Sequence, residues 1–86
     1  MGGTRRITVL YFAAVRERIG RDQDELDLPR EIVDVRALSA WLESVHPVLR
    51  GTLAQCRFAV GEEFRMPSHA LEAGDVVAVI PPVAGG

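Results

Sequence analysis

One amphipathic helix set among short strands is the feature that most limits how this chain can fold. Apolar residues recur at helical spacing on one face of residues 35–45, and Asp34 just before them is a favourable N-cap. His46-Pro47 ends the segment, because a residue that precedes proline avoids helical geometry. The flanking strands must bury their apolar faces against this single helix. The sequence therefore predicts an α+β architecture with one long helix packed across one face of a sheet.

Apolar or alternating runs predict the strands of that sheet at residues 7–12, 25–28, 56–60, 64–66 and 76–80. A short helix over residues 13–19, stopped by Gly20, separates the first two strands, which we expect to pair with each other. The first and last strands are the most apolar, so they are predicted to be central neighbours. One helix covers only one face, and the other face should therefore expose an apolar patch of the kind that marks partner sites.

Composition excludes several classes of protein. The chain has 86 residues, enough for a single domain, and a net charge of −2, which gives no broad attraction for nucleic acid or membranes. All ten basic residues are arginines. One cysteine, Cys56, excludes an internal disulfide framework, and no targeting segment or membrane span is visible, so we expect a cytoplasmic protein.

The sequence ends in Gly85-Gly86, preceded by a stiff Pro81-Pro82 and by Val83-Ala84. Paired glycines remove side-chain bulk, and the prolines project the segment away from the sheet in an extended form. Such a bare end suits a carboxylate that another enzyme must thread, activate and load with sulfur. A frayed terminus is the competing interpretation, and the residues alone leave both open.

Two blocks of sequence resemble the ubiquitin-like sulfur-carrier family, and within it the small subunits of molybdopterin synthase. The first block is residues 9–20, VLYFAAVRERIG, and the second is residues 71–86, LEAGDVVAVIPPVAGG. The resemblance implies a β-grasp (ubiquitin-like) fold with a mixed sheet, in a single sulfur-carrier domain spanning residues 1–86 with a flexible C-terminal tail at 81–86.

The same resemblance implies a reaction cycle. An adenylating enzyme of the ubiquitin-activating type would use ATP to adenylate Gly86, and a sulfur donor would convert it to a thiocarboxylate. The molybdopterin synthase large subunit would then take up the tail in a heterotetramer, and the sulfur would pass to cyclic pyranopterin monophosphate to form the molybdopterin dithiolene. The chain would thus be a carrier more than an enzyme, with no cofactor bound permanently. The residues implied to contact partners are Gly85, Ala84, Val83, Pro82, Pro81, Ile80, Phe12 and Arg16.

Three other functions remain open: a sulfur carrier for thiamine thiazole synthesis, a ubiquitin-like protein modifier, and a β-grasp interaction module whose tail has no chemical role. Thiamine carriers tend to lack the helix at residues 13–19, which favours molybdopterin. The family often has Asn-Gly after the third strand where this chain has Gly61-Glu62, so the turn type is open.

Other reactive residues have structural interpretations. Cys56 alternates inward with Phe58 and is expected to pack as a small apolar residue. Trp41 falls on the apolar stripe of the long helix and is expected in the core. His46 and His69 have no ligand at metal-binding spacing, so no metal site is predicted.

Overall fold

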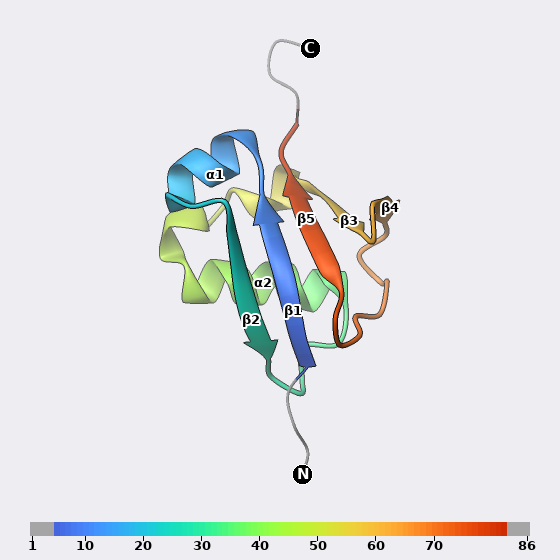
Figure 1. The fold of residues 1–86 in the computed structure, drawn as a ribbon. Coiled ribbons are helices and arrows are strands. Elements are labelled where there is room, and N and C mark those ends of the chain that lie inside the picture. Colours follow the sequence, from blue (N-terminus) through green and yellow to red (C-terminus); the bar gives the residue numbers. More distant parts are fainter. Residues whose placement is uncertain (1–4, 83–86) are drawn as a thin grey trace.

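Five strands form one mixed sheet in the order β2-β1-β5-β3-β4 (Figure 1). The computed structural model describes residues 5–82. The strands are β1 (Arg5–Tyr11), β2 (Gln23–Leu28), β3 (Arg57–Val60), β4 (Glu63–Arg65) and β5 (Val76–Ile80). All five predicted strands are present, with ends shifted by one or two residues.

The first and last strands lie side by side at the centre of the sheet, as predicted. They are parallel, with Thr8 opposite Val76 and Tyr11 opposite Val79. β2 pairs antiparallel with β1, which confirms the expected pairing, while β3 pairs antiparallel with both β5 and β4. Alternate residues of β1 and β5 therefore face the core, and the residues between them face outward.

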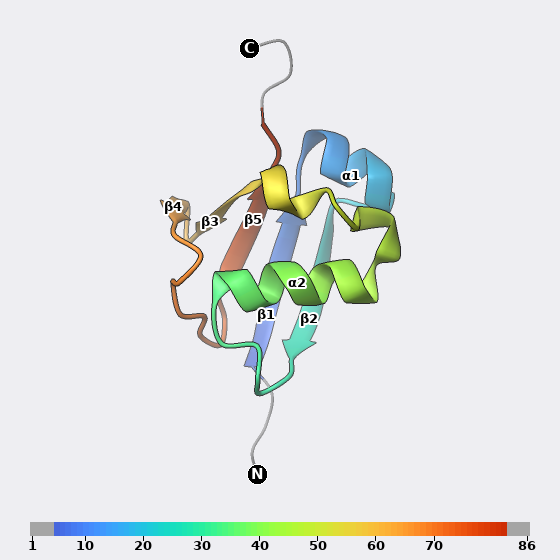
Figure 2. The same cartoon turned by 180° about the vertical axis from the view of Figure 1, so that it is seen from behind.

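The long helix α2 (Val35–Val45) has the predicted bounds and crosses one face of the sheet (Figure 2). Asp34 caps it, because its Oδ1 accepts a 2.9 Å hydrogen bond from the Ala37 amide. Leu38 and Leu42 are fully buried beneath it. The α+β layer prediction, with one long helix over one face, is confirmed.

The short helix α1 (Ala13–Ile19) lies beside the C-terminal ends of β1 and β5 and ends at Gly20, as predicted (Figure 1). Gly20 adopts φ = 85°, a left-handed conformation that favours glycine. Ala13 at the other end also has a positive φ, 50°, which is uncommon for a residue with a side chain. The chain therefore turns sharply as it leaves β1.

Between α2 and β3 the chain forms two 3₁₀ helices that the sequence pattern did not predict, η1 (Pro47–Leu49) and η2 (Leu53–Gln55). The Glu43 carboxylate accepts hydrogen bonds of 3.1 Å from the Gly51 and Leu53 amides and so fixes this segment onto α2. Cys56 belongs to the end of η2, since its amide donates to the Leu53 carbonyl. β3 consequently starts at Arg57, one residue later than predicted.

Two side chains on the stripe of α2 are less buried than its periodicity predicts. Trp41 is only partly buried against the core, and Val45 is exposed. Among residues 5–82, no helix is long and apolar enough to cross a lipid bilayer.

Candidate functional site

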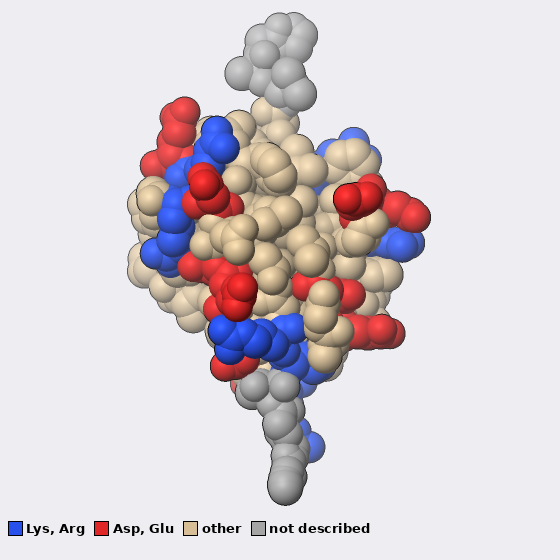
Figure 3. All heavy atoms as spheres, viewed as in Figure 1, with Lys and Arg blue, Asp and Glu red and all other residues tan. Residues whose placement is uncertain are grey.

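The face of the sheet opposite α2 carries a band of small and apolar side chains over β1 and β5 (Figure 3). Leu10 comes from β1 and Ala78 and Ile80 from β5, at positions that alternate with buried residues along each strand. Phe12 and Val76 remain 41% and 43% exposed on this side. Charged side chains gather at the flanks of the band, whose centre is free of them (Figure 3). The apolar patch predicted on the face that the helix leaves open is therefore present.

The band is hollowed over its middle. A depression of about 430 Å³ is lined by Leu10, Phe12, Ala59, Gly61, Glu62, Val76 and Ala78. Ala59 and Ala78 lie opposite each other on β3 and β5, and their small side chains leave room above the sheet. The depression can receive a bulky apolar side chain from a partner, because burying such a group removes its surface from water.

A second cavity lies where the chain leaves β5. About 470 Å³ of space is lined by Phe12, Ala13, Ala14, Glu17, Ile80, Pro81 and Pro82. Phe12 lines both this cavity and the depression, so the apolar surface continues to the start of the tail. The structure thus brings together four of the predicted partner-binding residues, Phe12, Ile80, Pro81 and Pro82.

Arg16 does not line either cavity. Its Nε lies 4.0 Å from a carboxylate oxygen of Asp22, and both side chains are largely exposed. Its predicted partner contact therefore lacks the apolar surroundings of the other four residues. Val83, Ala84, Gly85 and Gly86 lie outside the described residues.

The sequence predicted an apolar open face, but the predicted partner-binding residues did not include Leu10, Ala59, Val76 or Ala78. The period-two pattern of β1 and β5 already separates inward from outward positions, and it would have identified three of these four residues. Ala59 becomes part of the surface only because β3 packs beside β5. Glu17 is the charged residue in the cavity at the tail, and the sequence left open whether it belongs to a solvated helix face or contacts a partner.

Cys56 lies apart from the open face and is partly buried. Its thiol lies 3.5 Å from the Thr52 carbonyl, to which it can donate. Burial raises the pKa of the Cys56 thiol, and the Glu43 carboxylate adds to the shift. Because the thiolate is the reactive form, this environment agrees with the structural role expected from the sequence.

Acidic and basic groups also meet where β1 ends and β2 begins. Asp24 receives a hydrogen bond from the Tyr11 phenol, and its Oδ1 lies 2.8 Å from Arg21 Nε. His46 Nε2 is 3.3 Å from Asp24 Oδ2 but makes no hydrogen bond there. No group of three potential metal ligands is present within residues 5–82.

Comparison with known proteins places the chain in a family. The model of the ThiS family matches residues 9–86, and the chain therefore belongs to the ThiS family. Its relatives include the molybdopterin synthase sulfur carrier subunits of Chlamydomonas reinhardtii, 37% identical over 94% of this chain and 99% of that protein, and of Homo sapiens, 37% identical over 94% of each. Within the family the chain thus groups with these subunits, and the resemblance seen in the sequence is confirmed.

Solved structures agree on the fold. A Pyrococcus furiosus protein assigned as molybdopterin converting factor subunit 1 superposes with a TM-score of 0.81 at 31% identity, covering 93% of this chain and all of that one. Small archaeal modifier protein 1 of Haloferax volcanii gives a TM-score of 0.81 at 24% identity, covering 94% and 99%. A chain in the complex of subunits 1 and 2 of the Helicobacter pylori molybdopterin-converting factor superposes with a TM-score of 0.68 at 24% identity, covering 94% of this chain and 99% of that one. The predicted β-grasp fold is confirmed.

Proposed function

We propose that this chain is the sulfur carrier subunit of a molybdopterin synthase and that the carboxylate of Gly86 carries the sulfur. The observation that supports this most directly is the family match, which runs through the last strand to residue 86. Nearly full-length relatives named as this subunit point the same way.

The chemistry starts from an unreactive carboxylate. An oxygen of Gly86 attacks the α-phosphorus of ATP, pyrophosphate leaves, and an acyl-adenylate forms in the active site of the adenylating enzyme. A sulfur nucleophile from the donor then attacks the acyl carbon and AMP leaves. If the donor presents its sulfur as a persulfide, the product of this attack is an acyl disulfide; a thiol then attacks the donor's own sulfur atom, forms a disulfide with it, and leaves the thiocarboxylate on Gly86. Glycine suits this position, because the absence of Cβ lets another enzyme's groups approach the acyl carbon closely.

Sulfur transfer sets the stoichiometry. A dithiolene contains two sulfur atoms and each carrier brings one, so two charged carriers supply each molybdopterin. Each transfer to cyclic pyranopterin monophosphate returns the carrier's carboxylate, ready for another round. The groups that position the pyranopterin belong to the large subunit, and the present chain supplies the sulfur.

The open face supplies the docking surface for the large subunit. The depression at Leu10 and Ala78 continues through Phe12 to the cavity at Pro81 and Pro82. A partner seated there would hold the start of the tail and the sheet at once. The Helicobacter pylori complex of subunits 1 and 2 supports this kind of assembly.

Two other functions use the same fold, a thiamine sulfur carrier and a protein modifier. The likeness to an archaeal modifier protein at 24% identity concerns the fold alone. The helix α1 and the molybdopterin-related relatives favour the molybdopterin pathway.

One reconstitution tests the proposal. The chain is incubated with ATP, an adenylating enzyme and a sulfur source, and its intact mass is measured before the large subunit and the pyranopterin are added. We expect one terminal oxygen to be replaced by sulfur, followed by dithiolene product. Deletion of Gly86 should abolish charging while unfolding stays unchanged. A charged chain that yields no dithiolene would contradict the pathway, and a chain that never gains sulfur would contradict the carrier role itself.

A further inference from the structure

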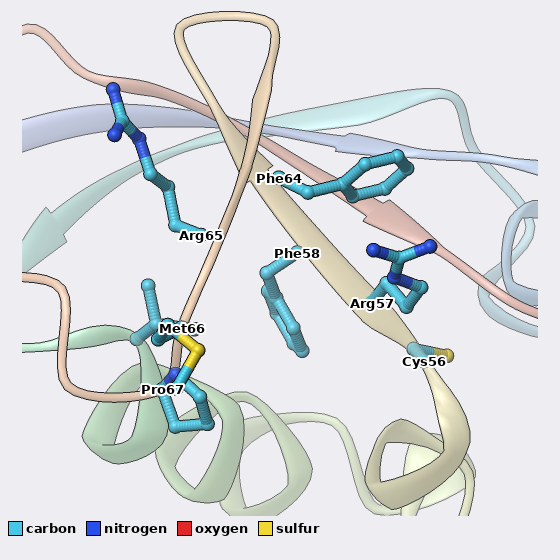
Figure 4. A pocket seen from close by; sticks show the side chains of 8 residues that line it. Cys56, Arg57, Phe58, Phe64, Arg65, Met66 and Pro67 are labelled. Carbon is cyan, nitrogen blue, oxygen red and sulfur yellow. The ribbon is translucent and has the colours of Figure 1, made fainter.

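A second surface lies at the β3–β4 edge of the sheet, beside the open face. A cavity of about 320 Å³ there is bounded by the start of β3, the end of β4 and the first residue of α2 (Figure 4). An adjoining cavity of about 430 Å³ runs along α2, and the two share Val35, Cys56, Phe58 and Pro67 as walls. We call this continuous surface the edge groove. It shares no lining residue with the depression on the open face.

The sheet is incomplete at this groove. β4 ends at Arg65, which lies opposite Phe58, so no strand pairs with β3 beyond that point on its outer side. Arg57 pairs with Ile80 on the inner side only. The chain continues from β4 through Met66 and Pro67 toward α2, and Figure 4 shows these residues across the cavity from Cys56 and Arg57. An extended segment of another protein can lie along the two adjoining cavities, which run from the end of β4 along α2.

The groove combines exposed apolar side chains with positive charge. Phe64 is 52% exposed and Met66 is 73% exposed. The Arg57 guanidinium lies 3.9 Å from the centroid of the Phe64 ring, which holds the cation at the rim. Aromatic residues, methionine and arginine are the types enriched in protein interfaces.

The charge of the groove is one-sided, although the whole chain has a net charge of −2. Arg36, Arg57 and Arg65 contribute to its walls. Within the described residues Arg36 and Arg57 make no ion pair, and Arg65 has only an exposed contact of 3.5 Å with Glu63, which contributes little. Glu43, the one acidic side chain in the walls, is engaged with two backbone amides.

We propose that the edge groove binds an extended acidic segment of another protein, with a bulky apolar side chain seated against Phe58 and Met66 and carboxylates facing Arg57 and Arg65. Charge complementarity selects the acidic partner, and the two adjoining cavities along β4 and α2 suit an extended segment. The inference does not depend on the tail, so it stands or falls independently of the sulfur-carrier role.

A titration of the full ¹⁵N-labelled chain tests this. The probe is a short peptide of alternating Glu and Leu residues, and its matched control has Gln in place of Glu. We expect saturable amide shifts at Arg57, Arg65 and Met66, with the Gln peptide at least about tenfold weaker. Equal binding of the two peptides, or shifts centred on Leu10 and Ala78, would overturn the proposal.

Substituted chains test which arginines bind the peptide. The double variant Arg57→Gln/Arg65→Gln should lose most of the peptide affinity, whereas Arg30→Gln, an exposed arginine outside the groove, should keep it. Unchanged binding by the double variant would contradict the proposal. The same would follow if an oligonucleotide or phosphatidylserine vesicles shifted these amides and the acidic peptide did not. The comparison of the two peptides on the unaltered chain needs no variant to fold.

Discussion

The Tyr11 phenol donates a 2.7 Å hydrogen bond to the Asp24 carboxylate and so joins the end of β1 to the start of β2. Tyr11 is almost fully buried. Burial, together with this hydrogen bond, holds the pKa of Tyr11 above its ordinary value. The folded chain therefore retains the phenol proton at a pH where the unfolded chain has lost it.

This relationship predicts how stability depends on pH. Below about pH 10 the phenol is protonated in both states and the stabilisation is complete. As the pH rises further, the unfolded chain releases the proton first, so the free energy of unfolding falls. Tyr11 is the only tyrosine, so alkaline absorbance titration reports it alone. Tyr11→Phe should lower stability by about 1 kcal/mol at neutral pH and remove this part of the alkaline decline. An ordinary tyrosine titration in the folded chain would contradict the prediction.

Arg5 is expected to stabilise the loops at the far end of the sheet. Its guanidinium donates to the carbonyls of Pro29, Ile32 and Leu71, at 2.9, 2.7 and 3.3 Å. Arg5→Gln should therefore lower the free energy of unfolding in urea by about 2 kcal/mol. The matched control is Arg6→Gln, which removes only exposed ion pairs with Glu25 and Asp27 and should change stability by less than about 1 kcal/mol. An equal loss of unfolding free energy in the two variants would show that the carbonyl contacts of Arg5 stabilise the fold no more than the exposed ion pairs of Arg6 do.

The hairpin between β3 and β4 should tolerate a more flexible residue. Gly61 and Glu62 have φ of 61° and 72°, so a non-glycine residue occupies the left-handed region in a two-residue turn. Glu62→Gly should raise stability by about 0.5–1 kcal/mol, because glycine adopts this conformation without steric strain. Glu63→Gly, one residue later in β4, should lower it. Thermal unfolding of both variants checks the opposite signs.

A substitution on the open face should weaken binding of the large subunit without destabilising the fold. Leu10→Gln removes an apolar side chain from the depression, and we expect affinity for the large subunit to fall about tenfold or more while thermal unfolding changes little. Val48→Gln makes the same chemical change at an exposed position of η1, outside the depression, and should bind normally. Calorimetry with the large subunit distinguishes the two. Loss of binding in both variants would contradict the assignment of the face.

Cys56 should react slowly and be dispensable for carrying sulfur. Near the ordinary thiol pKa of about 8.5, its raised pKa leaves less thiolate than an exposed cysteine would have. We expect iodoacetamide to alkylate the folded chain more slowly than the urea-unfolded chain at the same pH. Cys56→Ala should still acquire sulfur at Gly86. Failure of this well-folded variant to charge would assign Cys56 a chemical role.

The sequence allowed the main elements to be predicted, because they depend on local patterns. Asp34 indicated where α2 starts and His46-Pro47 where it ends, and the apolar runs of β1 and β5 indicated their central pairing. The details that escaped prediction depend on contacts between distant residues. Nothing near His46 in the sequence indicates Asp24, and nothing near Arg5 indicates the Leu71 carbonyl.

The candidate site likewise has one part that local sequence patterns predict and one part that depends on contacts between distant residues. The band on the open face follows from alternation within each strand, so its existence was predictable. The edge groove depends on where β4 stops and on how the following residues return to α2, and no periodic pattern reports that. The two 3₁₀ helices escaped for a similar reason, since Glu43 holds them through amides eight and ten residues further along the chain.

The parallel pairing of β1 with β5 has a consequence during synthesis. Thr8 lies opposite Val76, so the central hydrogen-bonded pair joins segments made almost a whole chain length apart. Such distant contacts form late in folding. A nascent chain that stops before Ile80 has a gap in the middle of its sheet and should be removed by proteases. We expect the ribosome to release foldable molecules only after the last strand has been translated, so that folding itself checks that the segment leading into the tail has been made.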